Sequence, residues 1–154
     1  MKTLILIAFI FFCGQIQGSE MPLSCKEAII SFFAQLKSGD QEKAINELMK
    51  EKIGKWGAKD SVIKMVSVLK NFQKESVGDF YGYDIIHQAS IGKNYISIVV
   101  MAKYERQPVF FRFKFYRPEK TFISDGLNMN TDESEVIKEW LSRNNELQDA
   151  PNIP

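Results

Sequence analysis

The hydrophobic pattern changes its period once along the chain. Over residues 24–72, apolar side chains recur every three or four positions, which predicts three amphipathic helices. Ser24 and Glu27 have the spacing of a capping box at the start of the first helix. Gly39 is expected to end that helix, and Asp40 to cap the second. The first half of the domain is therefore predicted to be helical.

Beyond Gly78 the apolar residues alternate with a period of two, which is typical of strands. The predicted strands are Tyr83–Ile91, Tyr95–Tyr104, Val109–Tyr116 and Thr121–Asn130. Short turns between them favour an antiparallel meander. A short terminal helix is expected to begin at Thr131 or Asp132. The pattern predicts an α+β fold: three N-terminal helices packed on a curved four-stranded antiparallel sheet, followed by a short C-terminal helix.

The N-terminus has the pattern of a cleavable signal peptide. Lys2 precedes ten almost uninterrupted apolar residues, 3–12, which as a helix would span only about 15 Å, half of a bilayer core. We predict a signal peptide at residues 1–18, with cleavage after Gly14 or Ser19 as alternatives. The mature protein is then expected to be periplasmic or secreted.

Removal of the signal peptide changes both the cysteine count and the charge. Cys25 becomes the single cysteine, so no internal disulfide is possible, and we expect a buried thiol rather than an intermolecular crosslink. Cys13 as a lipidated residue is the less favoured alternative, because Phe11 and Phe12 precede it. The 20 basic residues fall to 19 without Lys2, equal to the 19 acidic ones.

A neutral domain has no overall attraction to nucleic acid or anionic lipid, so neither a nucleic-acid partner nor stable membrane insertion after cleavage is expected. The local cluster Lys50, Lys52, Lys55 and Lys59 has Glu47, Glu51 and Asp60 beside it and is interpreted as a solvated surface. By length, residues 19–147 form one domain, and residues 148–154 are expected to be a disordered tail.

The two segments Val109–Pro118 and Thr121–Asn130 resemble the closing hairpin of small exported members of the nuclear transport factor 2-like, cystatin-like superfamily. Phe122 stands near the position where such members often carry a tryptophan. The resemblance implies a conical pocket between helices and sheet. Some members are isomerases or dehydratases, whereas many bind a ligand or a partner, so the fold alone does not assign a function.

Alternation along the strands suggests which residues line that pocket. The candidates are Tyr83, Ile85, His87, Phe113 and Asp125. If His87 and Asp125 face one apolar cavity, the carboxylate could orient the imidazole for acid–base chemistry. Alternatively, Gly126 permits a β-bulge that turns Asp125 toward solvent, and His87 is structural. No catalytic residue is assigned. One histidine and one mature cysteine give no metal site, and no cofactor motif is present.

The second face of the sheet carries many apolar residues for a surface exposed to solvent. The residues predicted there are Tyr95, Val99, Met101, Phe110, Arg112 and Tyr116. Aromatic residues mixed with arginine are typical of interfaces, which suggests a homodimer with sheets packed back to back. Alternatively, the terminal helix with Trp140 and Leu141 covers part of this face.

Three functions are compatible with these observations. The first is an exported, non-catalytic domain that binds a small apolar ligand or a protein partner in the pocket. The alternative is a small pocket enzyme of the isomerase or dehydratase type that uses His87 and Asp125. The third, an inhibitor or immunity-type protein, leaves no signature in the sequence.

Overall fold

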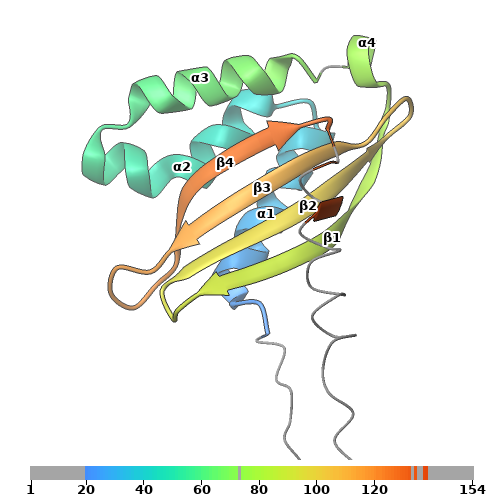
Figure 1. Ribbon diagram of the computed structural model, residues 1–154. Coiled ribbons are helices and arrows are strands. Elements are labelled where there is room, and N and C mark those ends of the chain that lie inside the picture. The colour runs from blue at the N-terminus through green and yellow to red at the C-terminus, as the bar shows by residue number, and fades with distance from the viewer. Residues whose placement is uncertain (1–19, 73, 133, 135–136, 139–154) are drawn as a thin grey trace, which may run out of the picture.

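The computed structural model describes residues 20–72, 74–132, 134 and 137–138. The helices are α1 (Leu23–Lys37), α2 (Gln41–Trp56), α3 (Lys59–Lys70) and the short α4 (Lys74–Val77). The strands are β1 (Phe80–Ile91), β2 (Tyr95–Tyr104), β3 (Val109–Tyr116) and β4 (Ile123–Asn130). Figure 1 shows α1 and α2 behind the sheet and α3 along its β4 side. None of the helices in this described part is long and apolar enough to cross a bilayer.

The sheet is an antiparallel meander in the order β1-β2-β3-β4, which confirms the predicted α+β fold class. The predicted signal peptide, the predicted tail, and Trp140 and Leu141 of the terminal helix lie outside the described residues. Within the described residues, the carboxylate of Asp132 accepts a hydrogen bond from the Ser134 N–H at 2.9 Å.

Of the two predicted helix caps, Asp40 is confirmed and Ser24 is not. Asp40 caps α2 as predicted, because its Oδ1 accepts a hydrogen bond from the Lys43 N–H at 3.0 Å. The capping box at Ser24 is wrong, since the N-cap of α1 is Pro22, two residues earlier, and the helix begins at Leu23. The Pro22 carbonyl accepts hydrogen bonds from the N–H groups of Cys25 and Lys26. Proline sets the backbone angle φ at the helix entry, so Ser24 already lies in the first turn.

Register divides the sheet residues between two faces. Directly paired residues share a face, so Val100, Phe111 and Met129 form one row across β2, β3 and β4. All three pack in the core with α1 and α2, and we call this the inner face. The adjacent row, with Val99 and Arg112, lies on the opposite, outer face.

Aromatic rings fill the space between the helices and the inner face. Phe33 of α1 stacks on Tyr83 with 4.2 Å between ring centroids, and it meets Phe111 edge to face at 5.4 Å. Phe32 meets Phe113 in the same way at 5.2 Å. Cys25 is fully buried in this core, which confirms the predicted buried thiol.

Candidate functional site

The centre of the helix–sheet interface is packed, not hollow. Tyr83 and Phe113, both predicted to line a pocket, instead contact Phe33 as members of the aromatic core. Ile85 is 46% exposed on the edge strand β1. The predicted pocket residues therefore do not enclose a common cavity at this position.

His87 lies on the outer face, not on the inner face with Tyr83 and Ile85 as predicted. Ile85 pairs with Val100 of the inner face, but His87 pairs with Val99 of the outer face. The register shift between Ile85 and His87 leaves Ile86 as an extra residue. Such a β-bulge inverts the alternation from that point on, so the side chains beyond it change face.

Asp125 is likewise the extra residue of a β-bulge, the alternative that Gly126 suggested. The register of β3 with β4 shifts between Lys114 and Phe115, where Gly126 and Ser124 are the partners on β4. The carboxylate of Asp125 lies 2.8 Å from the Nζ atom of Lys52 on α2, and this Nζ also donates to the Asp125 carbonyl. Lys52 therefore fixes both the side chain and the backbone of the bulge.

The structure does not bring His87 and Asp125 together. They lie on β1 and β4, the two edge strands, with β2 and β3 between them. Three strand spacings correspond to about 14 Å along the sheet, far beyond hydrogen-bond reach. A His–Asp acid–base pair is not formed in this arrangement.

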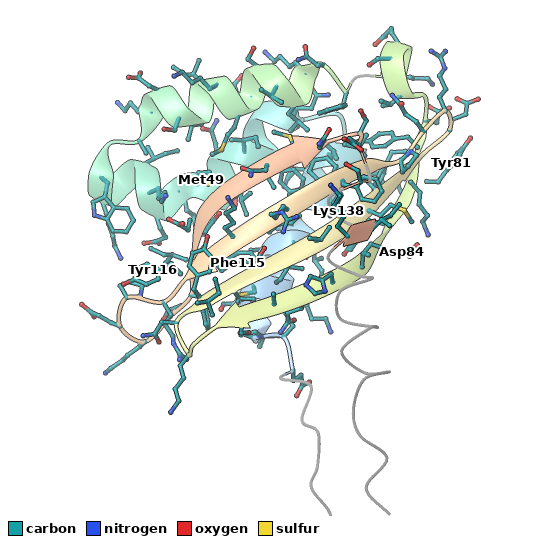
Figure 2. The ribbon with its side chains drawn as sticks, viewed as in Figure 1. Met49, Tyr81, Asp84, Phe115, Tyr116 and Lys138 are labelled. Atoms are coloured by element: carbon teal, nitrogen blue, oxygen red, sulfur yellow. The ribbon has the colours of Figure 1, made fainter. Side chains whose placement is uncertain are left out.

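A hollow in the described surface lies at one end of the inner face. It is a groove of about 640 Å³ between α1, α2 and the turn that joins β3 to β4. Figure 2 labels Phe115 of β3 and Met49 of α2 at this end of the sheet. Phe115, Phe32 and Leu48 are buried and supply apolar surface at the base of the groove. Ser124 adds a buried hydroxyl, which contacts the Met49 sulfur at 3.3 Å.

Charged side chains of both signs surround this apolar base. They are Glu27 of α1, Glu47, Lys50, Glu51 and Lys55 of α2, and Glu119 and Lys120 of the turn. Lys55 and Glu51 form an ion pair at 3.3 Å. The groove is thus amphipathic, with an apolar base and a charged rim.

Arg117 holds the turn that forms one wall of the groove. Its guanidinium carbon lies 4.9 Å from the ring centroid of Phe122, a residue that lines the groove. One guanidinium nitrogen donates to the Lys93 carbonyl at 2.6 Å, and the Arg117 N–H donates to the Asn94 carbonyl at 2.8 Å. The β1–β2 turn thereby fixes the position of Phe122.

The sequence carries no signal for this groove. Its walls come from residues 24–32 of α1, residues 47–55 of α2, Phe115 of β3 and residues 118–124, which are far apart in the sequence. Periodicity reports which residues share one face of one element, and it contains no signal for such a convergence. In the sequence, Phe122 stands out only through the family resemblance.

The six residues predicted to form an interface do share the outer face. Tyr95 pairs with Tyr116, Val99 with Arg112, and Met101 with Phe110. Within the single chain, however, Val99 is 1% exposed and Phe110 9%, and both pack with Ile86 and Met101. Tyr116, labelled in Figure 2, is 42% exposed. Of these six residues, Tyr116 is therefore the exposed one.

Two groups have strongly raised pKa values, and neither lines the groove. Burial raises the pKa of the Cys25 thiol to about 11, against an opposing hydrogen bond with Ser24. Burial also raises the pKa of Tyr104 to about 12. Both groups are therefore neutral at physiological pH. Among the described residues, no group of three or more His, Cys, Asp or Glu side chains could hold a metal ion.

The helices and sheet define an α+β domain that is consistent with a nuclear transport factor 2-like fold. Comparison of the chain with family models, with curated proteins and with solved structures found no match.

Proposed function

We propose that this chain is an exported, non-catalytic binding domain of the nuclear transport factor 2-like type, and that its groove binds an extended segment of a protein partner. The observation that carries the proposal is the groove itself, with its buried apolar base and a rim of both charge signs. Its volume of about 640 Å³ is within the range of ligand sites.

The character of the groove favours a peptide over a small apolar ligand. A small apolar ligand binds best in an enclosed apolar cavity that excludes water. Here seven charged residues surround the base, so a ligand must satisfy charges at the rim and apolar contacts below. A peptide with an apolar side chain flanked by charged ones does both.

The enzyme alternative has less support, because it depends on His87 and Asp125. These residues lie on opposite edge strands, and the Asp125 carboxylate is paired with Lys52. The homodimer through the outer face also has limited support, since Val99 and Phe110 are already buried. Sedimentation velocity at tens of micromolar tests it: a dimer that Tyr116→Glu dissociates would support the homodimer, and a monomer would reject it.

A pair of variants on one helix tests the binding function. Ala28 of α1 lines the groove, whereas Ala34 of the same helix is exposed elsewhere. A displayed library of random 12-residue peptides is panned against the mature protein, and the affinity of enriched peptides is measured by fluorescence anisotropy. Ala28→Tyr should weaken binding at least tenfold by filling the groove, and Ala34→Tyr should not. Equal binding to both variants, or no enrichment, would reject the groove as the site.

Export is tested separately by the intact mass of the protein recovered from a bacterial periplasm or culture medium. The proposal expects a chain without residues 1–18 and without added lipid. A full-length chain in the cytoplasm would refute export while leaving the groove open to the peptide test.

A further inference from the structure

The junction between α2 and α3 combines exposed apolar side chains with basic ones. Trp56, the last residue of α2, is 57% exposed, and Ile63 of α3 is 66% exposed. We call the set Trp56, Lys59, Ile63 and Lys64 the α2–α3 corner. Gly57 adopts the left-handed conformation between the helices, and the Lys59 N–H donates to its carbonyl at 2.7 Å. This tight connection places Trp56 and the start of α3 at one corner.

The side chains of α3 are divided between the core and this corner. Val62, Val66 and Leu69 are buried, so Ile63 points away from the core. Ile63 lies only about 6 Å along the helix axis from Lys59, and residues four apart share a helix side. Figure 1 shows the α2–α3 connection at the end of the helical layer, projecting beyond the sheet. The two exposed apolar residues are therefore accessible together with the lysines.

Charge is concentrated in the same part of the chain. Residues 50–70 contain six lysines against Glu51 and Asp60, a formal charge of +4, although the whole chain carries +1. Lys52 and Lys55 are paired with Asp125 and Glu51, whereas Lys59 and Lys64 are exposed on α3. The near-zero net charge thus conceals a basic segment, and the remainder of the chain is acidic by 3 charges.

We propose that the α2–α3 corner docks reversibly on an anionic lipid surface, an interaction beyond the groove function and independent of it. Tryptophan and aliphatic side chains enter the interfacial region of a bilayer, and lysines extend to lipid phosphates. Each lysine near an anionic surface strengthens binding about fivefold. The corner supplies an apolar anchor and positive charge together, which complement the apolar interior and the negative headgroups of such a surface. This mode of binding does not require the chain to span the bilayer.

Trp56 itself reports the docking. The chain has two tryptophans, so the mature protein with Trp140→Phe has Trp56 as its single indole. This protein is mixed with vesicles of phosphatidylcholine and phosphatidylglycerol at 3:1, or of phosphatidylcholine alone. The proposal expects a blue shift of Trp56 emission with the anionic vesicles, which 0.5 M salt reverses. Co-sedimentation with Trp140 retained gives a second measurement that does not depend on the substitution.

Matched lysine variants distinguish vesicle binding through the α2–α3 corner from vesicle binding through the overall charge of the protein. Lys59→Gln with Lys64→Gln should weaken vesicle binding about 25-fold. Lys26→Gln with Lys37→Gln changes the charge equally at exposed positions of α1 and should leave binding unchanged. Absence of vesicle binding, or equal loss in both pairs, would overturn the proposal. A blue shift that grows with protein concentration without lipid would assign the corner to a second copy and also overturn it.

Discussion

Gly78 lies so close to Glu105 that a Cβ atom at position 78 would be 2.6 Å from the Glu105 Cβ. The contact joins the short α4 to the β2–β3 turn, where the Arg106 N–H donates to the Val77 carbonyl and the Glu105 N–H to the Asp79 carbonyl, both at 3.0 Å. Gly78 also has a φ of 83°, in the left-handed region. A glycine is therefore required here for two separate reasons.

Gly78→Ala should lower the free energy of unfolding by about 3 kcal/mol, from the left-handed backbone and from the clash with Glu105 together. Gly39→Ala is the matched control, because Gly39 has the same φ of 83° with nothing within 4 Å of an added Cβ. It should cost only about 1 kcal/mol. Urea denaturation measures both values. Equal losses would show that Glu105 moves away from the added Cβ with no loss of stability.

Arg117→Ala should lower the free energy of unfolding by about 1–2 kcal/mol, because it removes hydrogen bonds to Lys93 and Asn94 and the contact with Phe122. Arg117→Lys should restore only part of the lost stability, since a lysine ammonium lacks the planar fork of donors with which the guanidinium reaches Lys93 and Asn94 together. Lys120→Ala, at an exposed position of the same turn, should change stability by less than about 0.5 kcal/mol. Thermal denaturation compares the three variants, and full rescue by lysine would contradict the geometric argument.

The sequence predicted the fold well because each strand has one continuous apolar face over most of its length. Between β2 and β3 the alternation is unbroken, and the predicted faces of Val99 and Phe113 agree with the register. The six residues predicted for the outer face were placed correctly, because the alternation along β2 and β3 is unbroken. Alternation, however, cannot show whether an outer-face residue is covered, so the burial of Val99 and Phe110 was not predicted.

The prediction of the candidate site failed at two of the register shifts, the bulges at Ile86 and Asp125. Ile85 and Ile86 are both apolar, so the extra residue there leaves no mark on the hydrophobic pattern, and His87 was assigned to the wrong face. In β4, Gly126 gave a usable signal, and the bulge at Asp125 was foreseen as an alternative. The ion pair of Asp125 with Lys52 was not foreseen, because the two residues are 73 positions apart in the sequence.

Phe33→Ala should be among the most destabilising substitutions in the core, with a loss of about 3–5 kcal/mol in the free energy of unfolding. Phe33 is buried, stacks on Tyr83 and Phe80, and meets Phe32, Phe111 and Phe113 edge to face. Ile30→Ala on the same helix should cost less than about 1 kcal/mol, because Ile30 is half exposed. Chemical denaturation gives both values. A loss below about 1 kcal/mol for Phe33→Ala would contradict the packed core described here.

The buried Cys25 thiol predicts a loss of stability in alkaline solution. Burial raises its pKa from 9.0 to about 11 in the folded chain, so the unfolded chain releases its proton first. The stabilisation is complete below pH 9 and is lost as pH rises from 9 toward 11. The loss in the free energy of unfolding amounts to about 1 kcal/mol between pH 9 and pH 10. Urea denaturation at half-unit steps of pH measures this fall.

Cys25→Ala should flatten the pH profile between pH 9 and pH 10 while it lowers stability at all pH values through the lost thiol packing. Tyr104, whose pKa is raised by burial from 10.0 to about 12, adds a separate fall above pH 10. Tyr104→Phe should remove only that later fall, so the two variants separate the two groups. An unchanged slope between pH 9 and pH 10 in Cys25→Ala would mean that another group governs alkaline unfolding.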